Sequence, residues 1–229
     1  MIFSPLYYRE EPLCNSCTPL SVVTDDGVEL EGVVYEPKEH KNTLLVFVGR
    51  SHDAVGLINR LAKLYPTIRI ITFNYRSYGK SGGVASEKNF LHDGVKIAQL
   101  VKKNYGDFYL LGFSIGSSVA AYVAAKVEVK GLFLIGAFDS IASLVKRKFS
   151  INLKPLLRYR FNTKDFIQNV DADTYLFVSR DDETTYIQNA RILKENVQNL
   201  RYYVELDGLH HKEILWDEYV VEKIKEVIS

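Results

Sequence analysis

Residues 109–118 read Tyr-Leu-Leu-Gly-Phe-Ser-Ile-Gly-Ser-Ser, an apolar run that ends in the pattern Gly-x-Ser-x-Gly around Ser114. The apolar residues before Ser114 are typical of a buried strand. The residues after it, from Ile115 to Lys126, are apolar on nearly all sides, which predicts a helix packed on several faces. The stretch therefore predicts a strand, a turn at Ser114 and a helix.

The composition is that of a globular protein. A chain of 229 residues suits one α/β domain, here predicted to span residues 1–229. Hydrophobic residues make up 47% of the chain and charged residues 25%. The numbers of basic and acidic side chains, 29 and 28, are nearly equal. The net charge of +1 gives no reason to expect nucleic acid as a partner.

Strands and helices alternate along most of the chain. Residues 20–35 alternate around Asp25-Asp26-Gly27, which predicts an antiparallel hairpin at the edge of a sheet. Continuous apolar runs predict buried strands, and helical spacing predicts the segments between them. This alternation favours a mostly parallel eight-stranded sheet with right-handed crossovers and helices on both faces. Strands are expected at 43–48, 68–73, 109–113, 131–135, 174–178 and 200–206, and helices at 54–65, 87–103, 115–126, 186–196 and from Trp216 to Ile228.

The stretch around Ser114 resembles the nucleophile elbow of the α/β-hydrolase superfamily, closest to its small-lid, depalmitoylase-like esterases. In such an elbow Gly112 and Gly116 are needed because β-carbons would collide in the tight turn. The loop 74–83, Asn-Tyr-Arg-Ser-Tyr-Gly-Lys-Ser-Gly-Gly, resembles the YRGYGxSxG loop of the same proteins. The resemblance implies the α/β-hydrolase fold over nearly the whole chain, with residues 137–172 as a minimal lid.

The resemblance also implies a Ser-Asp-His triad in that chain order. After the strand that ends at Val178, counting along the motif places the acid on Asp182, with Asp181 as the alternative. After the last strand, a Gly-x-x-His turn places the base on His211, with His210 as the alternative. The expected catalytic residues are therefore Ser114, Asp182 and His211, whereas His40, His52 and His92 lie in less suitable places.

Two backbone amides are expected to stabilise the oxyanion. One is the N–H of Ile115, at the start of the helix after the elbow, where the helix dipole favours negative charge. The other is the amide of Arg50, by its position after the strand 43–48. Val48 stands where relatives carry histidine, and Val178 also departs from the family pattern, so the detailed shape of these loops stays open.

The lid segment is basic and apolar. Between Asp139 and Asp165 stand seven lysines and arginines: Lys146, Arg147, Lys148, Lys154, Arg158, Arg160 and Lys164. Aromatic and aliphatic residues are interleaved with them. One interpretation is that the lid receives an acylated, anionic substrate, or contacts a membrane surface. The other is that its apolar residues pack on the sheet while the charges face water.

Cys14 and Cys17 are the two cysteines, and they form a Cys-x-x-Cys pair. Two ligands are too few for a self-contained zinc site, so we expect a surface pair without chemistry, and a disulfide or an intermolecular metal remains the alternative. The first five residues lack a basic segment followed by an apolar core, and no run reaches the ~18 apolar residues of a membrane span. We therefore expect a cytoplasmic protein without stable membrane insertion.

The leading functional hypothesis is a carboxylester or thioester hydrolase that works through an acyl-enzyme on Ser114. Its partner would be a small-molecule or acylated substrate, and it requires neither a metal nor an organic cofactor. The same triad also cleaves amides, so a peptidase remains an alternative. A non-catalytic binding protein with this fold is the other alternative, suggested by Val48 and Val178. Acyl length and oligomeric state stay open at the level of sequence.

Overall fold

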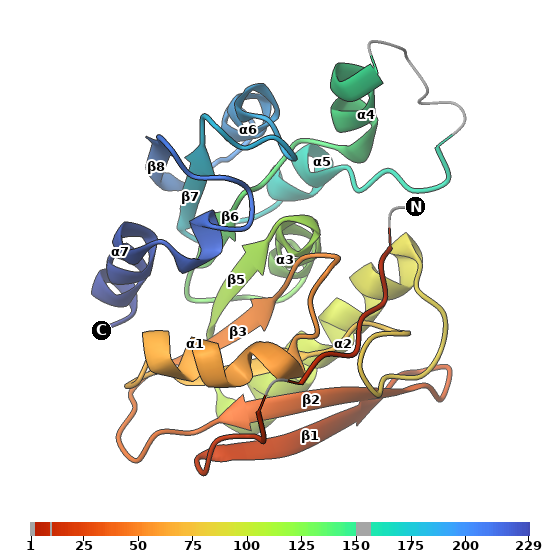
Figure 1. Ribbon diagram of the computed structural model, residues 1–229, viewed down its shortest axis with the longest axis vertical. Helices are drawn as coiled ribbons and strands as arrows, with labels where there is room; N and C mark the ends of the chain where they lie inside the picture. The colour runs from red at the N-terminus through yellow and green to blue at the C-terminus, as the bar shows by residue number, and fades with distance from the viewer. Residues whose placement is uncertain (1–2, 10, 150–156) are drawn as a thin grey trace.

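The computed structural model describes residues 3–9, 11–149 and 157–229, whose strands form one sheet of eight (Figure 1). Their order in the sheet is β1-β2-β4-β3-β5-β6-β7-β8. The pairs β1–β2 and β2–β4 are antiparallel and every other pair is parallel, which confirms the predicted sheet. The strands are β1 (Cys17–Val23), β2 (Glu29–Tyr35), β3 (Thr43–Phe47), β4 (Arg69–Phe73), β5 (Tyr109–Phe113), β6 (Leu132–Ile135), β7 (Thr174–Ser179) and β8 (Leu200–Leu206).

Helices cover both faces of the sheet (Figure 1). α1 and α7 lie on one face, whereas α2, α3, α5 and α6 pack in succession against one another on the other. The helices are α1 (Ile58–Leu64), α2 (Glu87–Tyr105), α3 (Ile115–Ala124), α4 (Ile141–Phe149), α5 (Thr163–Ile167), α6 (Ile187–Lys194) and α7 (Glu218–Ile228), with 3-10 turns η1 (Val55–Leu57) and η3 (Ile214–Trp216).

Capping side chains explain where two of the helices, α2 and α7, begin. Ser86 and Asp217 precede α2 and α7, and their side chains accept hydrogen bonds from the amides of Asn89 and Val220. Because Asp217 is extended, Trp216 belongs to η3 rather than to the closing helix, contrary to the sequence prediction. Likewise, the predicted helix 54–65 begins as the 3-10 turn η1.

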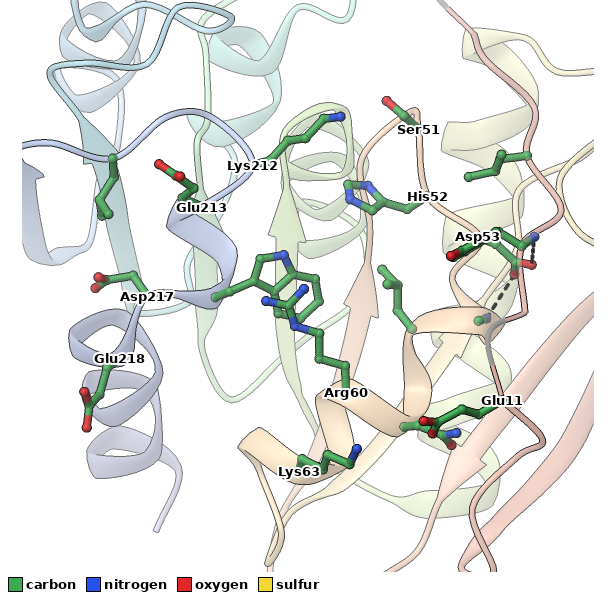
Figure 2. Close-up of a pocket in the computed structure, with 17 residues that line it drawn as sticks. Glu11, Ser51, His52, Asp53, Arg60, Lys63, Lys212, Glu213, Asp217 and Glu218 are labelled. Atoms are coloured by element: carbon green, nitrogen blue, oxygen red, sulfur yellow. Dashed lines mark hydrogen bonds between the residues drawn. The ribbon is translucent and has the colours of Figure 1, made fainter.

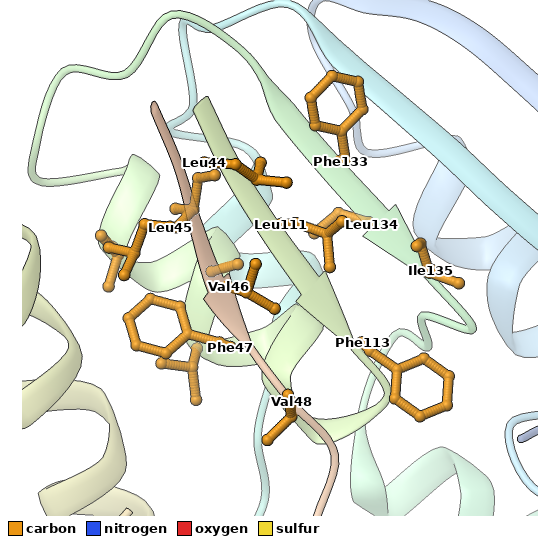
Figure 3. Packing of buried hydrophobic residues seen from close by; sticks show 14 of the residues in the cluster. Leu44, Leu45, Val46, Phe47, Val48, Leu111, Phe113, Phe133, Leu134 and Ile135 are labelled. Carbon is orange, nitrogen blue, oxygen red and sulfur yellow. The ribbon is translucent and has the colours of Figure 1, made fainter. Parts of the chain in front are cut away.

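The core lies on both sides of the central strands. Every residue of β3 and β6 is buried, and Figure 3 shows how side chains from β3, β5 and β6 pack together. The apolar runs that predicted these strands are apolar because helices cover both faces of the sheet at this point. The fully buried rings of Phe47, Phe113 and Phe133 lie in this region.

The chain reverses its direction across the sheet between β3 and β5. From β3 it passes through α1 to β4 on one side, and it then returns through α2 to β5 on the other. The two connections therefore pass over opposite faces of the sheet, and the chain has its switch point at the carboxyl ends of β3 and β5. Such switch points are the usual ligand sites of open α/β sheets. Ser114 follows β5 and lies at this switch point, beside the end of the neighbouring strand β3.

Candidate active site

Ser114 occupies a strained turn between β5 and α3. Its φ is +55°, a region that residues other than glycine rarely adopt and that costs about 1–3 kcal/mol. Its amide donates to the carbonyl of Ile135 at 3.0 Å, and its carbonyl accepts from the amide of Ser117 at 2.9 Å. A β-carbon added at Gly112 would lie 2.4 Å from the carbonyl oxygen of Gly116. The two glycines therefore allow the turn that lifts the Ser114 side chain above the end of the sheet.

The structure brings Ser114, His211 and Asp182 together. His211 Nε2 lies 2.8 Å from Ser114 Oγ, and His211 Nδ1 lies 2.7 Å from Asp182 Oδ2. The three residues are 9%, 7% and 5% exposed, respectively. The imidazole also stacks on the ring of Phe113, with centroids 5.0 Å apart, which limits its rotation. A base linked at one nitrogen to a hydroxyl and at the other to a carboxylate is the arrangement that activates a serine nucleophile.

Asp182 is held in place by three further donors. Its Oδ1 accepts from the amides of Thr184 and Thr185, both at 2.8 Å, and its Oδ2 accepts from the hydroxyl of Thr185 at 2.5 Å. Burial opposes ionisation of Asp182, but the hydrogen bond from His211 and those from Thr185 outweigh it and hold its pKa below the ordinary value. The carboxylate therefore stays charged at neutral pH and favours His211 Nδ1 as a donor.

The alternative residues point elsewhere. Asp181 accepts from the amide of Gly208 at 2.7 Å and so ties the end of β7 to the turn after β8. His210 is exposed and faces Glu183, with 3.4 Å between Nδ1 and the carboxylate. Of each adjacent pair, only Asp182 and His211 are directed toward Ser114.

The two expected oxyanion donors belong to the residue after Ser114 and to the loop after β3. Ile115 is the first residue of α3, so its N–H has no partner within the helix. Arg50 follows β3, and the end of that strand contacts the start of α3. A β-carbon at Gly116 would lie 2.2 Å from the carbonyl oxygen of Phe47 and 2.7 Å from that of Val48. The loop of Arg50 therefore leaves the sheet directly beside the elbow.

Sequence reasoning missed His52, which lies in this same loop. Its ring packs edge-on against Phe113, and its Nδ1 would be 3.2 Å from a β-carbon at Gly49. Burial, together with the nearby charge of Lys212, lowers the pKa of His52, so the ring is neutral at pH 7. In the sequence His52 lies in a less suitable place than His211, and only the fold brings both imidazoles against the ring of Phe113.

A cavity of about 910 Å³ opens beside the site, between α1 and the segment from Leu209 to Glu218 (Figure 2). Its wall includes Ser51 and His52 from the loop after β3, and Lys212, the neighbour of His211. Arg60 of α1 covers the indole of Trp216 of η3 at 3.8 Å, and both side chains line the cavity. The residues Ser114, Asp182 and His211 do not line it, so the cavity borders the two loops of the site rather than containing the serine.

The segment between β6 and β7 carries α4 and α5. Among the described side chains of α4, none is buried, and Phe149 is 56% exposed. Lys146 and Lys148 are exposed, whereas Arg147 donates to the side chain of Asn189 at 2.9 Å. Lys154 lies outside the described residues. Further along, Phe161 is fully buried and packs with Phe3 and Phe90, so this part of the segment is anchored to the body of the protein.

Cys14 and Cys17 form a disulfide, contrary to the expectation of a free surface pair. Two kinds of feature are absent from the described ranges. No three His, Cys, Asp or Glu side chains gather there as a metal site requires. None of the helices found there has the length and apolarity to cross a membrane.

Comparison with known proteins yields weak sequence similarity and strong structural similarity. No family model matches the chain. Uncharacterized protein R595 of Acanthamoeba polyphaga mimivirus is 23% identical over 229 residues, which covers 88% of this chain and 78% of the viral protein.

Solved structures superpose over nearly the whole chain. The Pyrococcus furiosus esterase Pf2001 has a TM-score of 0.74 at 17% identity, covering 99% of this chain and 96% of the esterase. An α/β hydrolase from Vibrio vulnificus has a TM-score of 0.76 at 16% identity, covering 93% and 81%. The esterase EaEST of Exiguobacterium antarcticum has a TM-score of 0.69 at 15% identity, covering 93% and 100%. The sheet order, the elbow and these superpositions agree that the chain has the α/β-hydrolase fold.

Proposed function

We propose that this protein is a serine hydrolase that cleaves a carboxylic ester or thioester through an acyl-enzyme on Ser114. The observation that carries the proposal is the position of His211, which lies within hydrogen-bond distance of both Ser114 and Asp182. The strained elbow, the buried carboxylate with a lowered pKa and the similarity in fold to named esterases support the same reading.

In the first half of the reaction, Ser114 Oγ attacks the acyl carbonyl carbon while His211 Nε2 takes its proton. Asp182 keeps His211 Nδ1 protonated and stabilises the resulting imidazolium. The amides of Ile115 and Arg50 donate to the oxyanion of the tetrahedral intermediate. When this intermediate collapses, His211 returns the proton to the leaving alcohol or thiol, and the acyl group remains bound to Ser114.

In the second half, water attacks the acyl-enzyme and His211 accepts its proton. The second tetrahedral intermediate then releases the carboxylic acid, and the proton returns to Ser114 Oγ. The cycle consumes one water and one ester, and every proton passes through His211. No residue other than the triad and the two amides is needed for the covalent steps.

A series of p-nitrophenyl esters with increasing acyl length, measured beside an acyl-coenzyme A, tests this function and its substrate class. We expect turnover with at least one ester or thioester, and loss of that turnover in Ser114→Ala. A folded wild-type protein that hydrolyses none of these substrates would count against the hydrolase and in favour of a binding protein with this fold.

A further inference from the structure

Two buried tyrosines hold the loop that carries Arg50. The hydroxyl of Tyr75 donates to the carbonyl of Val48 at 3.0 Å, and the hydroxyl of Tyr78 donates to the carbonyl of Arg50 at 2.8 Å. Both tyrosines come from the loop between β4 and α2, some 27 residues further along the chain. The two bonds fix the peptide groups immediately before Gly49 and immediately after Arg50.

The peptide group between those two carries the Arg50 N–H. Gly49 imposes little restriction of its own on backbone rotation. With the peptides on either side fixed, however, the central group is left with little freedom to turn. Space is also limited, because a β-carbon at Gly49 would lie 3.2 Å from His52 Nδ1 and 3.3 Å from the ring of Phe113. A rotation of this peptide would direct a carbonyl, rather than an amide, toward a developing oxyanion.

The tyrosines are themselves immobile. Tyr75 stacks on Phe90 with centroids 3.9 Å apart, and Tyr78 meets the same ring edge-on at 6.0 Å. The amide of Ser4 donates to the hydroxyl oxygen of Tyr78 at 3.0 Å, which leaves the hydroxyl proton for the carbonyl of Arg50. Burial raises the pKa of Tyr75 and of Tyr78, so both remain protonated donors.

We propose that Tyr75 and Tyr78 are positioning residues that hold the Arg50 amide of the oxyanion hole in its donating orientation, through hydrogen bonds to the carbonyl groups of Val48 and Arg50. The proposal rests on the hydrolase function proposed above. Neither tyrosine touches the substrate in this account. They act on the transition state through the backbone, because a preorganised donor stabilises charge without reorganising during the reaction.

The chain offers a matched control. Tyr65 is also buried, and within the described part of the structure its hydroxyl has no hydrogen-bond partner. Tyr65→Phe therefore removes a buried hydroxyl without touching the loop of Arg50. Tyr75→Phe and Tyr78→Phe remove one loop hydrogen bond each and keep the aromatic packing.

The test compares these three variants with wild type on a p-nitrophenyl ester, together with inhibition by a trifluoromethyl ketone, which forms a tetrahedral oxyanion on the serine. We expect kcat to fall about 10-fold in each of Tyr75→Phe and Tyr78→Phe, with KM nearly unchanged. That loss lies below the roughly 10²–10³ seen when an oxyanion donor itself is removed. The inhibition constant should rise by the same factor by which kcat/KM falls, and Tyr65→Phe should match wild type in both measurements.

Circular dichroism and thermal unfolding establish whether each variant is folded. If either Tyr75→Phe or Tyr78→Phe does not fold, the test is made with the other. Folded variants that keep the wild-type kcat and the wild-type ketone affinity would refute the positioning role, even if they are less stable. A wild type without Ser114-dependent turnover would refute the hydrolase function, and this inference with it. An active wild type with unaffected tyrosine variants would refute this inference alone.

Discussion

Gly116 packs directly on the backbone of Phe47, so that a β-carbon at Gly116 would lie 2.2 Å from the Phe47 carbonyl oxygen. This contact joins the first turn of α3 to the end of β3. It therefore fixes the distance between the elbow that carries Ser114 and the loop that carries Arg50. The absence of a β-carbon at Gly116 thus sets the spacing of the two expected oxyanion donors.

Gly116→Ala should consequently disturb both stability and catalysis. The added β-carbon would collide with backbone atoms, which cannot move aside as a flexible side chain can. We therefore expect the free energy of unfolding to fall by about 1–3 kcal/mol or more. We also expect a lower kcat. Gly82→Ala is the control, because a β-carbon there meets its nearest neighbour at an ordinary 3.5 Å. Urea unfolding of both variants measures the difference, and equal stabilities would contradict the account.

Asp182→Asn should lower kcat by about 10⁴-fold, because an amide favours the wrong tautomer of the histidine. Asp181→Asn is matched in position and chemistry, but its carboxylate accepts from the Gly208 amide rather than from His211. It should therefore retain most of the activity. Steady-state kinetics of both variants on one ester measures the difference in kcat. A larger loss in Asp181→Asn than in Asp182→Asn would mean that Asp181, and not Asp182, orients the histidine.

The lowered pKa of Asp182 makes a prediction about acid stability. A carboxylate whose pKa is lower in the folded than in the unfolded state contributes stability that is fully present above the unfolded value of about 3.9. The contribution is lost as pH falls from the unfolded value through the folded value, because over that range the unfolded state binds more protons than the folded state. The stability difference between wild type and Asp182→Asn should therefore shrink as pH falls below about 4. Urea titrations at successive pH values measure it, and a difference that grows with acidity would contradict the assignment.

The exposed lysines of α4 should matter only for anionic substrates. Lys146→Gln together with Lys148→Gln removes two charges from the surface of the lid segment, while Arg147 remains bonded to Asn189. We expect kcat/KM for an anionic acyl ester to fall about 2- to 10-fold, with little change for a neutral one. Lys38→Gln with Lys41→Gln is the control, because this exposed loop precedes β3 and lies at the end of the parallel strands opposite to Ser114. Equal effects on both esters would refute a role for lid charge in recognition.

The central sheet could be predicted from the sequence because each of its strands is a local pattern. The apolar run at Thr43–Phe47 and the Gly-x-Ser-x-Gly turn need no knowledge of the rest of the chain. The boundary at Asp217 was missed because the apolar spacing continues through Trp216, and only an extended capping residue separates η3 from α7. The disulfide between Cys14 and Cys17 is only an alternative at the level of sequence, because spacing alone does not reveal the turn that brings the two sulfurs together.

Some residues around the candidate site can also be predicted from local sequence, whereas others are revealed only by the fold. Ser114, Asp182 and His211 stand at recognisable places after strands, and the structure brings them together. Tyr75 and Tyr78 stand in a loop whose sequence resembles a family pattern, yet nothing in that pattern says which carbonyls their hydroxyls reach. Those contacts join two loops across the switch point of the sheet. They depend on the fold, as does the position of His52 beside Phe113.

If Ser114 is an activated nucleophile, a fluorophosphonate probe should react with it. The probe phosphonylates a serine only when a base removes its proton and donors stabilise the charge that develops on the phosphoryl oxygen. The account predicts one label per chain, located by mass spectrometry on the peptide that contains Ser114, and no label on Ser114→Ala. Folded wild-type protein that stays unlabelled, or a label that persists in Ser114→Ala, would contradict it.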